Sequence, residues 1–316
     1  MTRRLPRDTP LAGLVHGING LWRPCDCALF APAVYAASDP VFLVGAPRSG
    51  TTLAFQVLTH ALQMSFLPRA LDHAYGGSHL FFRLFLARLQ RQPAPQFVSD
   101  QGVTPGIFSP SESFGFWRQW FQGLSSDACL EPLPDEQVKS LQRAVYSIQG
   151  HARQPLLVKC LYLSLAIPAL IAAFPRARFI WVIRDPVAVA ASVLRIRQSH
   201  PELDWWSVRP PGYQQHMNEP LEDQVMWQLA ETLRLLRAAL HDVPLSQWQI
   251  LRYEDVCAGP QQQVDMMAHW LSSTGCKPYA EQHMPERFMA RSVVDDALRA
   301  RLQQSVYYPH VQEAMP

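Results

Sequence analysis

The sequence lacks a long apolar run, a block of basic residues and any internal repeat or low-complexity tract. Its 28 Lys and Arg nearly balance 26 Asp and Glu, so the formal net charge is +2 and gives no reason to expect a nucleic acid as partner. No apolar stretch approaches the roughly 18 residues of a membrane span, and prolines and a glycine interrupt the segment after Arg3 and Arg4 that could otherwise begin a signal peptide. The sequence therefore predicts a soluble, cytoplasmic protein without a transmembrane segment.

Cysteine is also scarce. The 316 residues contain six cysteines at irregular spacings, and the Cys25-x-Cys27 pair has no second pair to complete a metal site. We therefore expect no bound metal and no disulfide among Cys25, Cys27, Cys129, Cys160, Cys257 and Cys276.

A further absence lies in residues 41 to 52, which read VFLVGAPRSGTT, an apolar strand followed by a glycine-containing loop. Against the nucleotide-binding pattern G-x-x-x-x-G-K-[ST], Gly45 and Gly50 fit and Thr52 supplies the hydroxyl, but Thr51 stands where the lysine belongs. Kinases and NTPases use that lysine on the β- and γ-phosphates and the next hydroxyl on Mg²⁺. Its absence argues against a P-loop kinase.

What this loop does contain is one cation, Arg48, among backbone N–H groups and the hydroxyls of Ser49, Thr51 and Thr52. Such a loop suits a single phosphate whose outer substituent is transferred without a metal ion. A phosphosulfate meets that description.

A second strand and helix carry another pair of phosphate-binding side chains. Residues 178 to 183, RFIWVI, have the composition of a buried strand, and Pro186 opens the helix that follows. This places Arg184 at the carboxyl end of the strand and Ser192 on the helix, at the rim where open α/β sheets bind ligands. Arginine binds phosphate bidentately, and serine adds a neutral donor.

Together the two segments resemble the sulfotransferase superfamily, which uses 3′-phosphoadenosine 5′-phosphosulfate (PAPS) as sulfuryl donor. The family's 5′-phosphosulfate loop commonly reads Pro-Arg-Ser-Gly-Thr-Thr, and its 3′-phosphate is bound by an arginine at a strand end and a serine eight residues later, as Arg184 and Ser192 are spaced. The likeness is to bacterial members related to the Golgi carbohydrate and tyrosylprotein branch. It implies that the chain binds PAPS through Arg48, Ser49, Gly50, Thr51, Thr52, Arg184 and Ser192.

Two more segments match this family. Residues 155 to 160, PLLVKC, predict a central strand with Lys159 at its carboxyl end, where Lys159 either stabilises the bridging oxygen, faces the acceptor, or extends to solvent from a strand end. Residues 248 to 256 resemble the family's late strand ending in Arg-Tyr-Glu-Asp. The resemblance makes Tyr253 a cofactor contact, whereas Glu254 and Asp255 are expected to cap or brace the junction.

Sulfuryl transfer to a hydroxyl requires a base and a group that stabilises the leaving phosphate oxygen. Arg48 suits the second role, assisted by Thr51, Thr52 and Lys159. For the base, Glu112 lies in SPSESF, which resembles a Pro-x-Glu segment of bacterial members; the alternative is an acid capping a helix. Residues 64 to 76 lack the glutamate that Golgi-type members place after the first helix, so the other candidates are Asp72, His73 and His79.

The acceptor is suggested by an aromatic insertion at residues 204 to 214, DWWSVRPPGYQ. Trp205, Trp206 and Tyr213 offer faces on which sugars stack, although packing of a loop explains them as well. We expect a hydroxyl on a carbohydrate or glycolipid, or alternatively a secondary-metabolite or phenolic hydroxyl. A nonenzymatic PAPS-binding relative is the other functional alternative, and the oligomeric state stays open.

The predicted fold is α/β, with a P-loop-type, largely parallel sheet flanked by helices on both faces and helical insertions. Strands ending at Val44, Val158, Ile183 and Leu251 should point at one cofactor cleft. Residues 1 to 38 form an extension packed on a single catalytic domain, 39 to 316, and the proline-rich residues 93 to 111 form a long loop. Helices are expected at residues 51–63, 78–92, 112–124, 135–150, 164–174, 187–195, 220–241 and 260–272.

Overall fold

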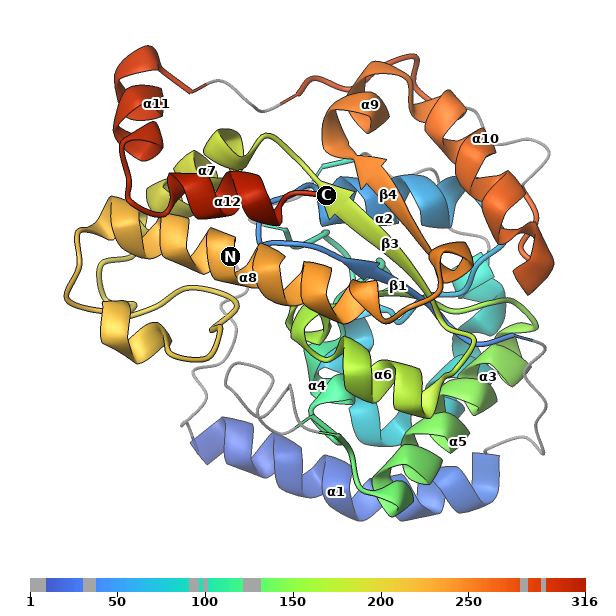
Figure 1. Ribbon diagram of the computed structural model, residues 1–316. Helices are drawn as coiled ribbons and strands as arrows, with labels where there is room; N and C mark the ends of the chain where they lie inside the picture. The colour runs from blue at the N-terminus through green and yellow to red at the C-terminus, as the bar shows by residue number, and fades with distance from the viewer. Residues whose placement is uncertain are drawn as a thin grey trace.

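The fold centres on a parallel sheet of four strands. The computed structural model describes residues 10–30, 38–90, 97–98, 102–121, 132–278, 284–290 and 294–316. Strands β1 (Val41–Val44), β2 (Leu157–Lys159), β3 (Arg178–Ile183) and β4 (Trp248–Arg252) pair in the order β2-β1-β3-β4 (Figure 1). The predicted α/β class and the predicted strands are confirmed.

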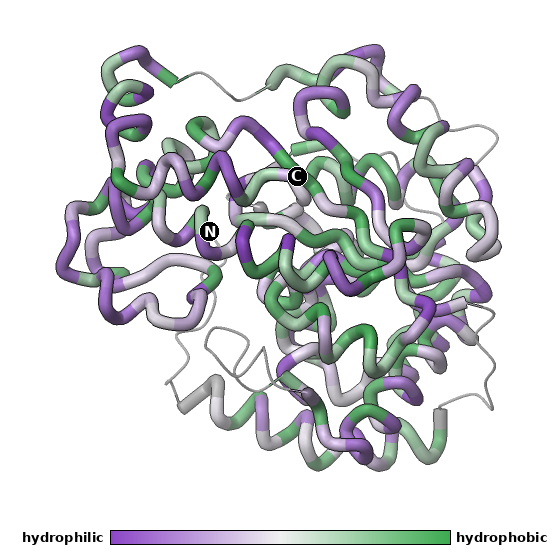
Figure 2. Tube along the Cα trace, viewed as in Figure 1, coloured by the Kyte–Doolittle hydropathy of each residue, from purple (hydrophilic) through white to green (hydrophobic). Residues whose placement is uncertain are grey.

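The apolar runs form strands because both faces of the sheet are covered. Every residue of β1 and β2 is buried, and in β3 only Arg178 is partly exposed, the pattern of a parallel sheet sandwiched between helices. Phe42 of β1 lies opposite Val158 and Phe179, and its ring stacks on that of Phe179 with centroids 5.6 Å apart. Figure 2 shows hydrophobic residues concentrated in these central strands.

Helices fill the connections between the strands. With right-handed crossovers, the connection from β1 to β2 lies on one face of the sheet, and the connections from β2 to β3 and from β3 to β4 lie on the other. In Figure 1, α6 and α8 lie in front of the sheet and α2 lies behind it. The α-helices are α1 (Pro10–Phe30), α2 (Thr51–Ala61), α3 (Ser78–Gln90), α4 (Phe114–Trp117), α5 (Asp135–Ala152), α6 (Ile167–Ala173), α7 (Pro186–Ser199), α8 (Leu221–His241), α9 (Tyr253–Ala258), α10 (Pro260–Leu271), α11 (Asp296–Gln303) and α12 (Tyr308–Ala314). The 3₁₀ helices are η1 (Arg69–Asp72), η2 (Tyr75–Gly77), η4 (Leu161–Leu165), η5 (Tyr213–His216), η6 (Leu245–Gln247) and η7 (Ser272–Thr274).

Most of the predicted helices are confirmed to within a few residues, but the helix expected at residues 112–124 is shorter. In the described part of that segment only Phe114–Trp117 is α-helical, and residues 122–131 lie outside the described residues. Ser113, with a left-handed φ of 45°, starts α4 only after Glu112. The end of the sequence-predicted long loop, residues 102 to 111, contains no helix; residues 93–96 and 99–101 lie outside the described residues.

The first helix is tied to α3 by a carboxylate. Asp26 of α1 accepts hydrogen bonds from the backbone N–H groups of His79 and Leu80, each at 2.9 Å, and so satisfies two donors in the first turn of α3. No helix among the described residues is long and apolar enough to cross a membrane. The division of the chain into residues 1 to 38 and a single catalytic domain, 39 to 316, stays a prediction.

Candidate cofactor and acceptor site

The loop between β1 and α2 needs glycine at both ends. A Cβ on Gly45 would lie 2.6 Å from the carbonyl oxygen of Val182 on β3, and a Cβ on Gly50 would overlap the ring of Tyr253. Gly50 also has a φ of 97°, which glycine adopts readily. The two glycines therefore allow the loop to sit tightly against β3 and the residue that follows β4.

The loop leads into the N-terminus of α2, where backbone N–H groups have no intrahelical acceptor. No side chain caps this end of α2. The Ser49 hydroxyl is buried and has no hydrogen-bond partner among the described residues. Buried polar groups are ordinarily paired, and helix N-termini favour phosphate. An orphaned hydroxyl beside these N–H groups fits a bound phosphate.

A second group of side chains surrounds this loop. Arg184, at the end of β3, is buried and donates from one guanidinium nitrogen to the carbonyl oxygen of Arg48 at 3.0 Å. The Arg184 guanidinium lies over the ring of Tyr253, 4.4 Å from its centroid. Arg48 in turn donates from Nε to the hydroxyl of Ser192 on α7 at 3.0 Å. The structure thus brings Arg48, Arg184, Ser192 and Tyr253 into one cluster, as the sequence motifs predict.

The orientation of the Arg48 side chain differs from the one that the sequence predicts. The sequence assigns Arg48 to the leaving phosphate oxygen and Ser192 to a separate phosphate, yet the Arg48 side chain hydrogen bonds to Ser192. Its backbone has a left-handed φ of 68°. The contact joins the two predicted phosphate sites through one residue.

Lys159 and Glu112 form a buried ion pair. Lys159 Nζ lies 2.7 Å from Glu112 Oε1, and the two side chains are 3% and 12% exposed. Lys159 ends β2, next to β1, and Glu112 follows a short bridge between Pro68 and Pro110. Burial, reinforced by the charge of Glu112, raises the pKa of the neighbouring Cys160 thiol. This pair occupies the same edge of the sheet as the phosphate loop, because parallel strands end on one side.

The other three base candidates have different surroundings. Asp72 accepts hydrogen bonds from the Ser111 hydroxyl at 2.8 Å and the Phe114 N–H at 2.9 Å, so it holds the chain on both sides of Glu112. His73 is exposed. His79 is buried in α3, where desolvation lowers its pKa. Of the four candidates, Glu112 contacts Lys159, another predicted site residue.

Residues 40–274 match the model of the Sulfotransferase family. The chain belongs to this family. Members of the family transfer a sulfuryl group from PAPS, so the expectation of a transferase is confirmed, and the sheet edge described above is the candidate PAPS site.

Curated relatives and a solved structure agree with this assignment. The omega-hydroxy-beta-dihydromenaquinone-9 sulfotransferases Stf3 of Mycobacterium bovis and Mycobacterium tuberculosis are each 24% identical over 280 residues, which span 79% of this chain and 67% of theirs. The crystal structure of sulfotransferase STF1 from Mycobacterium tuberculosis H37Rv superposes with a TM-score of 0.51 at 17% identity, covering 95% of this chain and 81% of STF1. That structural likeness shows the fold.

Two polar contacts in the candidate PAPS site involve partners, Ser164 and Gly102, that belong to no recognised sequence motif. Ser164 accepts a hydrogen bond from the Gly45 N–H at 3.1 Å and donates to the Gly45 carbonyl at 3.3 Å, so it fixes the start of the phosphate loop. Thr52 donates to the carbonyl oxygen of Gly102 at 3.3 Å, which joins the long loop to the first turn of α2. Sequence alone does not show which distant serine or carbonyl completes such a loop.

The junction after β3 is braced by Asp185 and by Glu254, whereas the sequence places Glu254 at the junction after β4. Asp185 caps α7 by accepting from the Val187 N–H at 3.0 Å, and its own N–H donates to Glu254 at 3.0 Å. Glu254 therefore supports the strand end that carries Arg184.

In the aromatic insertion Trp205 packs inward, whereas Trp206 and Tyr213 are partly exposed. Trp205 is 4% exposed and donates from Nε1 to the Val208 carbonyl at 3.0 Å. The Arg197 guanidinium lies 5.0 Å from the Trp205 ring centroid, and the rings of Tyr213 and Trp227 lie 5.2 and 6.0 Å away. Trp205 thus stabilises the insertion rather than presenting a face to a sugar.

Two further features of the described residues are their possible metal ligands and their cysteines. Within the described ranges, no group of three or more His, Cys, Asp or Glu is arranged to hold a metal ion. Cys25, Cys27, Cys160, Cys257 and Cys276 are free thiols, and Cys129 lies outside the described residues.

Proposed function

We propose that this sulfotransferase moves a sulfuryl group from PAPS to a hydroxyl group of its acceptor. The observation that carries the proposal is the cluster of Arg48, Arg184, Ser192 and Tyr253 around the phosphate loop. Two guanidinium groups and an unpartnered buried hydroxyl at a helix N-terminus favour a ligand with more than one anionic group.

Two groups of residues hold the two ends of the donor. Arg184 and Ser192 bind the 3′-phosphate, and Ser49, Gly50, Thr51 and Thr52 bind the 5′-phosphosulfate through backbone N–H groups and hydroxyls. Arg48 interacts with both ends because its backbone lies in the loop and its guanidinium lies against Ser192. Tyr253 contacts the cofactor, and its ring also packs against the guanidinium plane of Arg184.

Glu112 is the general base and Lys159 stabilises the leaving group. Glu112 accepts the hydroxyl proton as the acceptor oxygen forms a bond to sulfur, while the bond between sulfur and the bridging 5′-phosphate oxygen breaks. Lys159 and Arg48 stabilise the negative charge that develops on that oxygen. Lys159 Nζ lies 2.7 Å from Glu112 Oε1, so the proposed base and the proposed leaving-group stabiliser are in direct contact.

The acceptor is best described as an amphipathic molecule with a hydroxyl group. The sequence favoured a carbohydrate or glycolipid partly on its tryptophans, and Trp205 is packed into the insertion, which weakens the support for a free sugar. The curated relatives are named for omega-hydroxy-beta-dihydromenaquinone-9. A glycolipid or another lipid alcohol agrees with both observations, whereas a small phenol gains support from neither.

Isothermal titration calorimetry of the purified chain tests the donor assignment. Adenosine 3′,5′-bisphosphate should bind tightly without Mg²⁺, and AMP, which lacks the 3′-phosphate, should bind far more weakly. Binding of ATP only in the presence of Mg²⁺ would instead indicate a kinase. Bisphosphate binding without transfer of labelled sulfate to any hydroxyl acceptor would indicate a nonenzymatic relative.

A further inference from the structure

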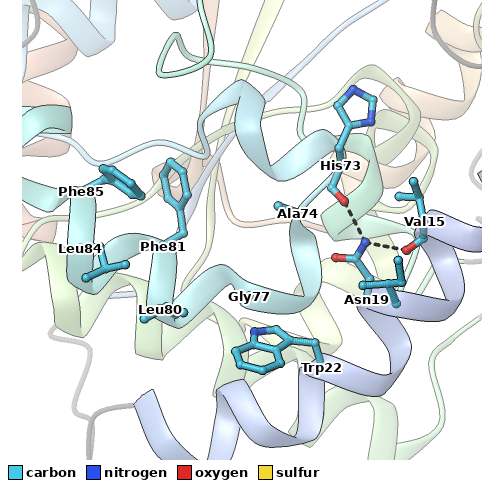
Figure 3. Close-up of a pocket in the computed structure, with 11 residues that line it drawn as sticks. Val15, Asn19, Trp22, His73, Ala74, Gly77, Leu80, Phe81, Leu84 and Phe85 are labelled. Carbon is cyan, nitrogen blue, oxygen red and sulfur yellow. Dashed lines mark hydrogen bonds between the residues drawn. The ribbon is translucent and has the colours of Figure 1, made fainter.

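Helices α1 and α3 enclose a cavity of about 380 Å³, within the size range of roughly 300–1,000 Å³ that is common for ligand pockets. Figure 3 shows side chains from both helices facing this space, with Phe81 and Phe85 on one side and Trp22 below Gly77. We call it the α1–α3 pocket. Its apolar lining includes Ile18, Trp22, Leu80, Phe81, Leu84 and Phe85.

The side-chain amide of Asn19, which lines the pocket, is already paired. Asn19 donates from its amide nitrogen to the carbonyl oxygens of Val15 at 2.7 Å and His73 at 2.8 Å, and its amide oxygen accepts from the Gly76 N–H at 2.5 Å. In Figure 3 the His73 ring points away from the apolar side chains. A sugar or phosphate in this pocket would lose its hydrogen bonds to water without replacement. An apolar chain has no such bonds to lose.

The pocket adjoins, through residue 72, the segment that carries Glu112. His73 and Ala74 line the pocket, and the preceding residue, Asp72, holds Ser111 and Phe114 on either side of Glu112. On the other side of the pocket, Phe108 of the long loop contacts Phe81 and Phe85, with ring centroids 6.0 and 5.4 Å apart. The pocket is therefore continuous with the structure that positions the proposed base.

The rim of the pocket is apolar and exposed. Leu84 is 63% exposed and Ile18 57% exposed, and both line the cavity. Burial of such surface by an apolar ligand is favourable. Exposed apolar residues around a pocket commonly mark a binding surface.

We propose that the α1–α3 pocket binds the alkyl or isoprenoid chain of the acceptor, so that the substrate class is a lipid alcohol. This inference rests on the proposed function, because the chain must belong to a molecule whose hydroxyl group reaches Glu112. The pocket contributes affinity and selects against short, fully polar acceptors. The phosphate-binding residues are not part of it.

A brominated alcohol tests this assignment on the full chain. 12-Bromododecan-1-ol quenches tryptophan fluorescence on contact, and Trp22 lines the pocket. Titration should give saturable quenching, and Trp22→Phe should remove that saturable component. Leu84→Asp, which places a charge at the rim, should raise the half-saturating concentration at least tenfold. Leu29→Asp is the matched control, since Leu29 on α1 is 66% exposed and does not line the pocket.

Three results would overturn the lipid pocket. The first is an equal effect of Leu84→Asp and Leu29→Asp on the half-saturating concentration, and the second is saturable quenching that survives Trp22→Phe. The third is a dimer that Leu84→Asp converts to a monomer in sedimentation without changing the half-saturating concentration, because a second copy of the chain would then cover this face.

The same preparations titrated with adenosine 3′,5′-bisphosphate distinguish this inference from the proposed function. Binding of the bisphosphate without saturable binding of the alcohol would reject the lipid pocket alone. Binding of the alcohol without the bisphosphate would leave a lipid-binding pocket and reject the sulfotransferase mechanism. Leu84→Asp should bind the bisphosphate as the unsubstituted chain does.

Discussion

At the scale of single residues, Arg48 connects the two parts of the donor site. Its carbonyl oxygen accepts a hydrogen bond from Arg184, and its guanidinium donates to Ser192. A residue with a left-handed φ of 68° is strained unless its surroundings hold it. We infer that these two contacts hold Arg48, so that the phosphate loop and the start of α7 form one binding unit.

Replacing Arg184 should identify the 3′-phosphate site. Arg184→Ala removes the charge expected to bind this phosphate, and a hydrogen bond to a charged group contributes about 1.5–3 kcal/mol, so affinity for adenosine 3′,5′-bisphosphate should fall at least about tenfold. Affinity for AMP should change little. Calorimetry with Arg252→Ala, an exposed arginine on β4, provides the control. Equal bisphosphate affinity in the two variants would contradict the assignment.

Replacing Glu112 should separate catalysis from binding. Glu112→Gln keeps the shape of the side chain and a hydrogen-bond acceptor for Lys159 but cannot take a proton, so turnover should fall by about 10²–10⁴. Bisphosphate affinity should be retained. Steady-state kinetics with labelled PAPS and an acceptor that carries a free hydroxyl measures the effect, and Glu136→Gln on the surface of α5 is the control.

Retained turnover in Glu112→Gln would transfer the role of base to Asp72 or His73. Asp72→Asn would then decide between them. Loss of turnover with unchanged thermal stability would assign the base to Asp72, and retained turnover would assign it to His73. Loss of both turnover and thermal stability would instead reflect the two hydrogen bonds that Asp72 accepts.

At the scale of elements, the sequence predicts best where strand, loop and helix follow one another directly. The run from Val41 through the loop to α2, and the run from β3 to α7, each contain the whole local pattern, and both are confirmed. Partners from distant segments are different. Ser164 hydrogen bonds to the Gly45 backbone, and Gly102 accepts a hydrogen bond from Thr52. Tertiary packing places these partners, and no spacing within the sequence predicts them.

Tertiary contacts also explain the misjudged helix near residue 112. Ser113 takes a left-handed conformation, and its hydroxyl donates to the Pro68 carbonyl at 3.1 Å. Asp72 accepts from the Phe114 N–H. These contacts stabilise an extended chain through Glu112 where local propensity alone favoured a helix. The same contacts keep the proposed base beside Lys159.

The phosphate loop yields a prediction about glycine. Gly50→Ala adds a Cβ that overlaps Tyr253 and requires a φ of 97° from a non-glycine residue. Gly212→Ala imposes a similar φ of 85° in open space, so it measures the backbone cost alone, about 1–2 kcal/mol. Gly50→Ala should be less stable than Gly212→Ala by thermal melting, and it alone should lose bisphosphate affinity. Equal losses in both variants would mean that Tyr253 does not pack against the loop.

At the scale of the whole molecule, topology concentrates the chemistry at one edge. The order β2-β1-β3-β4 places the carboxyl ends of β1, β2 and β3 next to one another, and these carry the phosphate loop, Lys159 and Arg184. A ligand bound there contacts elements on both faces of the sheet. The α1–α3 pocket lies on a different pair of helices, and Asp72, next to the lining residue His73, links it to the segment of Glu112.

The separation of the α1–α3 pocket from the donor site predicts how bisphosphate binding changes Tm in the unsubstituted chain and in two variants. Adenosine 3′,5′-bisphosphate at about 100 times its Kd should stabilise the folded chain by about 2.7 kcal/mol, which raises Tm by roughly 5 °C for a chain of this size. In Arg184→Ala, a tenfold weaker Kd should reduce the rise at the same concentration to about half. Leu84→Asp should keep the full rise, because none of the proposed donor-binding residues lines the pocket. Differential scanning fluorimetry of the unsubstituted chain, Arg184→Ala and Leu84→Asp measures the rise in Tm. If the bisphosphate raises Tm by the same reduced amount in both variants, the pocket and the donor site are energetically coupled.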